Sequence, residues 1–123
     1  MSKHIAPEAW RADLRHLAAE LPKRHANLFH TLTPERFAAA VAALDERIPG
    51  LAPHAVIVEI ARLAAQIGDG HTYLDMGDPG ESKVGFGRYP LRLYLFSDGL
   101  FVQAAGHEHA GAVGARVVAL GGV

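Results

Sequence analysis

Apolar residues recur at helical spacing through the first half of the chain. A first helix is expected from about Pro7 to Leu21, because proline suits the first turn of a helix and Pro22 then ends it. Its buried stripe consists of residues at intervals of four, three and four: Trp10, Leu14, Leu17 and Leu21. That spacing places them on one face, so the segment is predicted to be amphipathic.

A second and a third helix follow, each introduced by a proline. Thr33-Pro34-Glu35 supplies a capping hydroxyl, a proline at the first helical position and an acid at the positive end of the helix dipole. Pro49-Gly50 ends this helix, and Pro53 opens the next one, which extends to Gly68 as its C-terminal cap. The predicted buried stripes are Phe37, Val41, Leu44 and Ile48 in the second helix, and Val56, Ile57, Ile60, Leu63, Ala64 and Ile67 in the third.

The hydrophobic period changes from helical to alternating in the second half of the chain. The turn signal Ser97-Asp98-Gly99 joins an alternating run to a second extended run from Leu100 to Val102, which predicts a β-hairpin. In the first run Leu91, Leu93 and Leu95 alternate with Arg92, Tyr94 and Phe96. If the leucines face the core, another part of the protein must cover the face that carries Tyr94 and Phe96.

Together these elements predict an α+β fold. Residues 1–68 are expected to form an N-terminal three-helix bundle, and residues 69–123 a β-rich segment with the hairpin and a short, incomplete β segment. The last part is a short strand expected from Ala115 to Leu120. A glycine-rich loop from Asp75 to Arg88 joins the bundle to the hairpin.

Composition narrows the class of protein. Half of the 123 residues are hydrophobic and a fifth are charged, which is typical of a globular chain. The 12 basic and 13 acidic side chains leave a net charge of −1, so a basic nucleic-acid-binding face is not expected. The absence of cysteine excludes disulfides, thiolate zinc sites and a cysteine nucleophile. The N-terminus lacks an apolar core of signal-peptide length and charges interrupt every later apolar run, which predicts a cytoplasmic protein without a membrane span.

The most distinctive string is Gly68-Asp69-Gly70-His71-Thr72, at the end of the third helix. In a functional interpretation, Asp69 orients the His71 imidazole as a general base, as in two members of a catalytic triad. In a structural interpretation, Gly68 and Gly70 supply unusual backbone angles while Asp69 and Thr72 bond local backbone groups. The structural interpretation is favoured, because a base and its orienting residue two positions apart rarely share the required geometry.

Other candidate groups give weaker signals, and no cofactor or metal is expected. None of the three serines, Ser2, Ser82 and Ser97, lies in a Gly-x-Ser-x-Gly elbow, so a nucleophilic serine is not expected in this chain. His107-Glu108-His109 lacks the His-Glu-x-x-His spacing that pairs zinc ligands on a helix. This string is interpreted as a solvated loop.

Several local strings occur in one order along nearly the whole chain. They are a helix with Trp10, Asp13 and Leu14; His25-x-Asn27-Leu28-Phe29; Thr33-Pro34-Glu35-x-Phe37; Leu44 with Ile48-Pro49-x-Leu51; a helix with Leu63-Ala64 that ends Ile67-Gly68-Asp69-Gly70-His71-Thr72; and Tyr89-Pro90-Leu91. In this order they resemble the N-terminal part of tail-specific, or carboxyl-terminal processing, serine peptidases, to which tricorn-type proteases are related. Gly-Asp-Gly-His-Thr after such a helix is typical of many bacterial members.

The resemblance implies that residues 69–123 begin a PDZ-like region. Residues 113–122 are similar to a strand that usually reads Gly-Asp-x-Ile/Val-x-x-Ile-Asn-Gly, although Ala115 stands where the aspartate is common. The resemblance also implies a downstream α/β domain of the same protein with a catalytic serine and lysine, and none of that family's catalytic residues maps onto this chain.

We therefore expect a non-catalytic region of a serine-type peptidase. It would pack against the downstream catalytic domain and help to shape the entrance for a peptide or protein substrate. The alternative is a stand-alone peptide- or protein-binding module without enzymatic activity, which would use the exposed hairpin to engage its partner.

Overall fold

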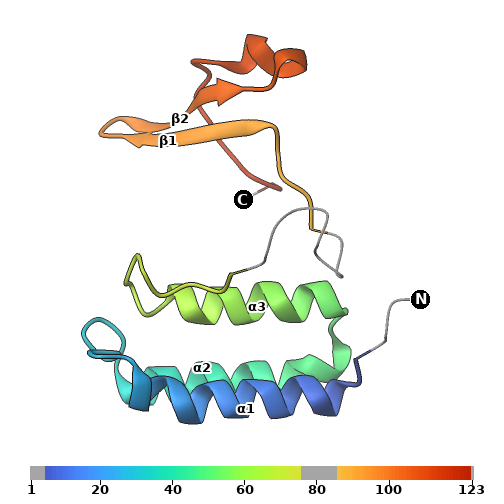
Figure 1. The fold of residues 1–123 in the computed structure, drawn as a ribbon, viewed down its shortest axis with the longest axis vertical. Coiled ribbons are helices and arrows are strands. Elements are labelled where there is room, and N and C mark those ends of the chain that lie inside the picture. Colours follow the sequence, from blue (N-terminus) through green and yellow to red (C-terminus); the bar gives the residue numbers. More distant parts are fainter. Residues whose placement is uncertain (1–4, 76–85, 123) are drawn as a thin grey trace. The chain divides into compact units, whose positions relative to one another are not determined.

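The computed structural model describes residues 5–75 and 86–122 and has the predicted α+β architecture, with three α-helices followed by an antiparallel hairpin. The chain separates into two compact units, residues 1–86 and 87–123 (Figure 1). The predicted helical domain, residues 1–68, falls within the first unit. The segment after the third helix, α3 (Pro53–Ala65), also belongs to that unit, because Thr72 bonds His25 and Leu74 packs against the helical core. Most of the loop predicted from Asp75 to Arg88 lies outside the described residues.

Helix α1 spans Pro7–Arg24, so the prediction that Pro22 ends it is wrong. Pro22 has no N–H to donate, but the His25 N–H still reaches the carbonyl of Leu21 at 2.9 Å, which closes the last turn after the proline. Glu20 pairs with Lys23 at 2.8 Å and with Arg24 at 3.3 Å across the same turn. The two basic side chains also suit the negative end of the helix dipole, which further stabilises the turn after Pro22.

Helices α2, Pro34–Arg47, and α3, Pro53–Ala65, begin at the predicted prolines. The Thr33 side chain accepts a hydrogen bond from the Arg36 N–H at 3.3 Å, as expected of a cap. A short 3₁₀ helix, η1 (Ile48–Gly50), follows α2. None of the helices in the described ranges 5–75 and 86–122 is long and apolar enough to cross a membrane.

The core of the first unit lies where the three helices meet (Figure 1). Most residues of the predicted stripes are buried, with Leu14, Ile48 and Val56 at most 1% exposed. Arg11 and Arg15 on α1 bond one carboxylate oxygen of Asp45 on α2, at 2.6 Å and 3.0 Å. This bridge lowers the pKa of Asp45, mainly through the hydrogen bond from Arg11, and joins the two helices at the edge of the core.

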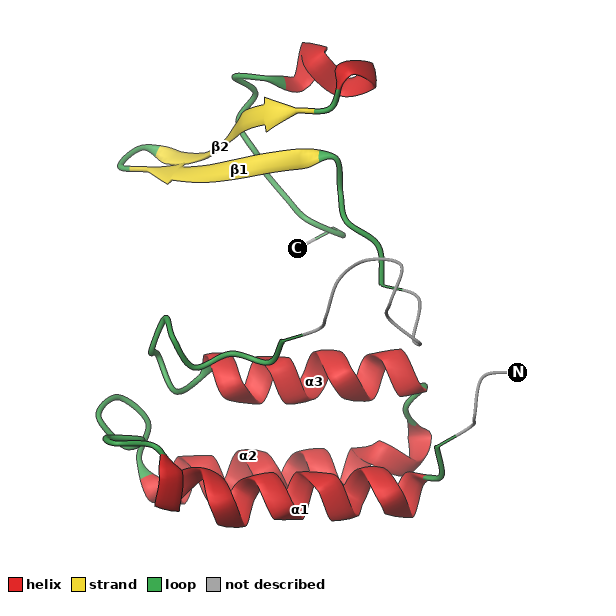
Figure 2. Ribbon diagram, viewed as in Figure 1, coloured by secondary structure: helices red, strands yellow, loops and turns green. Residues whose placement is uncertain are grey.

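The second unit contains the predicted hairpin of β1, Leu91–Phe96, and β2, Gly99–Ala105, followed by a short 3₁₀ helix η2, His107–Ala112 (Figure 2). The strand predicted from Ala115 to Leu120 is wrong, because only a single bridge forms there, between Arg116 and Phe101. Its backbone follows the outer edge of β2 through hydrogen bonds at residues 114–117. Beyond them Val118 is 89% exposed, and no strand among the described residues extends the pairing.

Candidate functional site

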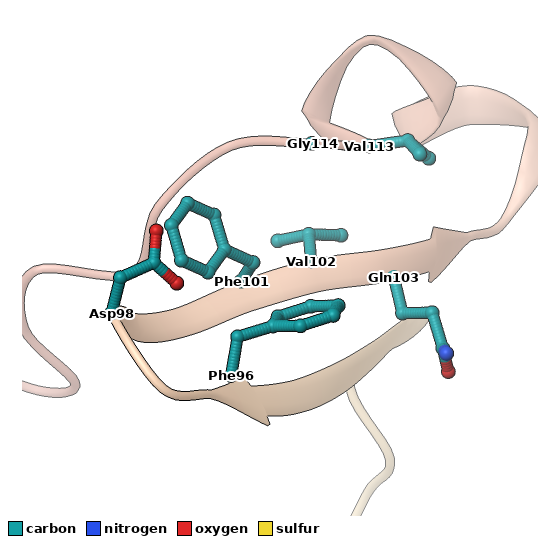
Figure 3. A pocket seen from close by; sticks show the side chains of 7 residues that line it. All are labelled: Phe96, Asp98, Phe101, Val102, Gln103, Val113 and Gly114. Atoms are coloured by element: carbon teal, nitrogen blue, oxygen red, sulfur yellow. The ribbon is translucent and has the colours of Figure 1, made fainter.

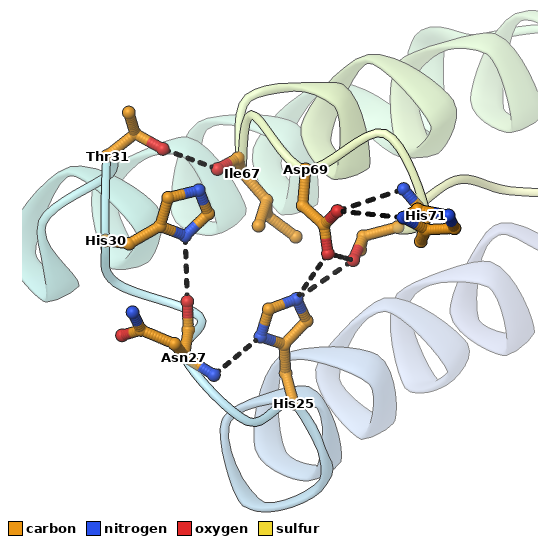
Figure 4. Close-up of polar contacts among 8 residues, drawn as sticks. His25, Asn27, His30, Thr31, Ile67, Asp69 and His71 are labelled. Atoms are coloured by element: carbon orange, nitrogen blue, oxygen red, sulfur yellow. Dashed lines mark hydrogen bonds and ion pairs between the residues drawn. The ribbon is translucent and has the colours of Figure 1, made fainter.

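Two segments far apart in the sequence meet through polar side chains in the first unit (Figure 4). His25 and Asn27 come from the loop after α1, and Asp69 and Thr72 from the segment after α3. We call these four residues the polar junction. The His25 Nε2 atom lies 2.9 Å from the Thr72 hydroxyl and 3.3 Å from Asp69 Oδ2. The His25 side chain is only 14% exposed, so the loop after α1 is anchored by a largely buried imidazole.

Backbone geometry assigns a role to each nitrogen of the His25 ring. The Asn27 N–H donates to His25 Nδ1 at 3.1 Å, so that nitrogen is an acceptor. A neutral imidazole then carries its proton on Nε2 and donates it to the Thr72 hydroxyl oxygen. The Thr72 hydroxyl in turn donates to Asp69 Oδ2 at 2.9 Å. The junction is therefore a chain of hydrogen bonds from imidazole to hydroxyl to carboxylate.

Asp69 organises the turn that follows α3. Its Oδ1 atom accepts the His71 N–H at 3.0 Å, and its carbonyl oxygen accepts the Thr72 N–H at 3.1 Å. Hydrogen bonds to its carboxylate lower the pKa of Asp69 to about 2: the backbone N–H of His71 has the largest effect and the Thr72 hydroxyl the next, while burial acts in the opposite direction. The carboxylate is charged at neutral pH and holds both the turn and the junction.

The ring of His71 lies at the exposed edge of this network. Its side chain is fully exposed, and its Nδ1 atom lies 3.7 Å from Asp69 Oδ1, beyond hydrogen-bond distance. The backbone bonds made by Asp69 and Thr72 match the structural interpretation of the segment. The structure thus pairs Asp69 with His25 more closely than with His71, the partner considered in the functional interpretation.

The two glycines of the segment differ in a way that the sequence did not reveal. The prediction that α3 extends to Gly68 as its cap is wrong, because α3 ends at Ala65 and its C-cap is Gln66. The unusual backbone angle expected at Gly68 is present, with a φ of +76°, and a Cβ atom there would lie 2.8 Å from Thr31 Oγ1. Gly70 has no positive φ, and a Cβ atom there would meet nothing within 4 Å. The expected unusual backbone angle at Gly70 is therefore wrong, because the turn reverses at Gly68 and Asp69 then holds residues 70–72 by ordinary hydrogen bonds.

Thr31 restricts residue 68 to glycine. Its hydroxyl donates to the carbonyl of Ile67 at 2.7 Å, which satisfies a backbone group at the end of α3. Ile67 itself is fully buried, so the bond fixes the loop before α2 against the end of α3. Any side chain at residue 68 would compete with this hydroxyl for space.

No sequence signal predicted that His25 and Asn27 contact residues 68–72. A histidine two residues before an asparagine in a short connector is a weak signal, since the side chain could bond many local groups. The only indication was that both strings belong to the resemblance. Their contact spans 47 residues and depends on how α1 and α3 pack.

The remaining candidates do not form a site in the described residues. Ser97 lies in the turn between β1 and β2, while Ser2 and Ser82 lie outside the described part. His107 and His109 are exposed and lie in η2, where the sequence predicted a loop. In ranges 5–75 and 86–122 no group of three metal-ligating side chains is close enough to hold an ion.

The second unit has a hollow of about 460 Å³ on the hairpin. Figure 3 shows its side chains: the rings of Phe96 and Phe101 come from the two strands and Asp98 from the turn between them. The other lining residues are Val102, Gln103, Val113 and Gly114. The hollow is open and mostly apolar, with a carboxylate at one end, which is a surface suited to contact with another apolar group.

Comparison with protein-family models, with curated proteins and with solved structures found no match to this chain.

Proposed function

We propose that this chain is the N-terminal, non-catalytic region of a serine-type peptidase of the tail-specific family. The main support is the polar junction. Two of the strings that carry the resemblance, His25-x-Asn27 and Gly-Asp-Gly-His-Thr, lie far apart in the sequence and bond each other through His25, Thr72 and Asp69. Motifs that meet in the folded chain are expected to act as one unit, so the junction accounts for both of them together.

In the complete protein, a serine of a downstream α/β domain would attack the peptide carbonyl, and a lysine would accept the serine proton as general base. The present chain would contribute no catalytic residue and would help to form the substrate entrance. The junction holds the loop after α1 against the segment after α3, and His71 stands exposed beside it. This surface would pack against the catalytic domain and form one wall of the entrance for a peptide or protein substrate.

The test is a comparison of matched histidine variants in the complete protein. His25→Ala removes the acceptor for the Asn27 N–H and the donor to Thr72, so we expect it to lower kcat/KM for unstructured casein. His16→Ala changes an exposed histidine of α1 and should leave the activity unchanged. Equal activity of both variants would remove the support that the junction provides.

The isolated chain should show no peptidase activity above blank. Activity that vanished on Ser97→Ala would contradict the proposal, since the nucleophile would then lie in this chain. Reading the coding sequence beyond Val123 is the simplest check, because the proposal requires a further domain with a serine and a lysine. The proposal includes a cytoplasmic location, which cell fractionation would test.

The open hollow on the hairpin favours a second candidate, a stand-alone peptide- or protein-binding module without enzymatic activity. The rings of Phe96 and Phe101 lie 5.8 Å apart at this surface, and Phe96 is 48% exposed. Exposed aromatic groups of this kind commonly mark an interaction surface. A stop codon directly after Val123 would favour this candidate over the peptidase region.

A further inference from the structure

The hairpin presents one open edge along β1. On β2, the Val102 N–H donates to the Ala115 carbonyl, the Val102 carbonyl accepts from Gly114, and the Leu100 carbonyl accepts from Val117. The backbone groups of Leu100 and Val102 thus point away from β1. The outer edge of β2 is covered by this contact with residues 114–117.

The register identifies the groups exposed on β1. Leu93 faces Val102 and Leu95 faces Leu100 across the hairpin. In an antiparallel pair, opposite residues either both bond inward or both point outward. The N–H and C=O groups of Leu93 and Leu95 therefore point away from β2. No hydrogen bond within the described residues reaches these outward groups.

The side chains of this edge are unusually apolar for an open strand. Leu95 is 73% exposed, Tyr94 51% and Phe96 48%, and Arg92 is the only charge in β1. Natural proteins protect open edges with lysine, proline or a covering element. Backbone groups and apolar side chains here fit another extended strand.

We infer that β1 pairs with β1 of a second copy of this chain in a two-fold antiparallel arrangement. With the axis at Tyr94, each Leu93 exchanges backbone hydrogen bonds with Leu95 of the other copy, as the outward groups require. Tyr94 lies opposite its own counterpart, and Arg92 lies opposite Phe96. This register pairs residues 92–96 of the two copies.

Charge and shape favour a second copy as the occupant. Arg92 meets an aromatic ring rather than another arginine, which turns a possible repulsion into a favourable contact. The rings of Tyr94, Phe96 and Phe101 already form one cluster, with centroids 4.7 Å and 5.8 Å apart, and the pairing extends that cluster across the axis. A net charge of −1 adds little repulsion between copies. The inference does not depend on the peptidase proposal.

Sedimentation of the full 123-residue chain tests the association. Because strand pairing alone buries a small area, we expect a weak dimer that appears as the concentration rises from about 5 to about 500 µM. A chain that stays monomeric over this range would overturn the inference. A chain that is monomeric alone but binds extended apolar peptides would also overturn it and would assign the edge to a peptide.

A cysteine placed at the axis tests the register, since the chain has no cysteine of its own. Under mild oxidation, Tyr94→Cys should form a covalent dimer. The backbone groups of residue 94 point toward β2, so the two copies of residue 94 form a non-hydrogen-bonded pair, in which opposite Cβ atoms lie close together. Leu95→Cys is the matched control: it is adjacent, more exposed and faces Leu93 of the other copy. Crosslinking of Leu95→Cys as fast as Tyr94→Cys would contradict the register.

Charged residues placed at position 94 test the two-fold arrangement without oxidation. Tyr94→Lys and Tyr94→Glu each place like charges at the axis, and each should raise the dissociation constant about tenfold. An equimolar mixture should dimerise again, because lysine then faces glutamate. The hairpin fold of each variant is checked by amide exchange at Phe101, which pairs with residue 94. A mixture no more dimeric than the separate variants would overturn the two-fold arrangement.

Discussion

Replacing Gly68 by alanine should destabilise the helical unit through two separate effects. The φ of +76° at this residue disfavours any side chain by about 1 kcal/mol. The new Cβ atom would also lie 2.8 Å from Thr31 Oγ1, a hydroxyl held by its hydrogen bond to the Ile67 carbonyl. If the hydroxyl moves, that bond is lost at about another 1 kcal/mol. We therefore expect Gly68→Ala to lower the free energy of unfolding by about 2 kcal/mol.

Gly70→Ala is the matched control. Gly70 has no positive φ and open space around its Cα, so its replacement should change the free energy of unfolding by less than about 0.5 kcal/mol. The single tryptophan, Trp10, packs against the core of the same unit, so its fluorescence during urea denaturation reports the relevant unfolding.

A double-mutant cycle separates the two effects at Gly68. In a Thr31→Ala background the hydroxyl is absent, so Gly68→Ala should lose only the backbone term of about 1 kcal/mol. An undiminished loss in that background would show that Thr31 is not the obstacle. Equal losses for Gly68→Ala and Gly70→Ala would refute the assignment of the turn to Gly68.

Four further predictions follow from the two units. The folded state lowers the pKa of Asp69 from an ordinary value of 3.8 to about 2, so the charged carboxylate stabilises the fold at a pH above 3.8. That stabilisation should be lost as the pH falls toward 2, and Asp69→Asn should flatten this part of a plot of stability against pH. His71→Ala should leave the melting temperature unchanged, since the ring is fully exposed; loss of activity in the complete protein with unchanged stability would instead support its role as a general base. Thr33→Ala should lower the free energy of unfolding by about 1 kcal/mol through loss of the α2 cap, measured by urea denaturation, whereas Thr33→Asp should retain the cap. Hydrogen exchange should be slower in α3 than in β1 at low protein concentration, and stronger protection of β1 there would contradict the view that the hairpin is the weaker unit.

Local rules account for the parts of the fold that the sequence predicted. A capping threonine followed by proline defines the start of α2 because those groups act on their own turn. Pro53 likewise starts α3, and the stripe that includes Leu14 is set by helical spacing alone. The turn Ser97-Asp98-Gly99 predicted the hairpin for the same reason, since its conformation depends on adjacent residues.

The tertiary structure decided the features in which distant groups compete. Pro22 is inside α1 because the residues around it still close the last turn. The presence of proline in the sequence does not reveal whether those hydrogen bonds form. Residues 115–120 have the composition of a strand, yet their contact with β2 amounts to one bridge at Arg116 and hydrogen bonds that end at Val117. The choice between Gly68 and Gly70 as the constrained position depends on Thr31, which approaches from another loop.

The polar junction also combines a feature that the sequence predicted with one that only the tertiary structure decided. The sequence identified Gly-Asp-Gly-His-Thr as an unusual string, and the only partner it offered for Asp69 was His71, in the functional interpretation that was not favoured. Packing of α1 against the other helices brings His25 within 2.9 Å of Thr72 instead, and places the ring of His71 in solvent. Periodicity and capping could determine the helices, since both act within a few residues, whereas the partner of Asp69 depended on a contact across 47 residues that only the folded chain creates.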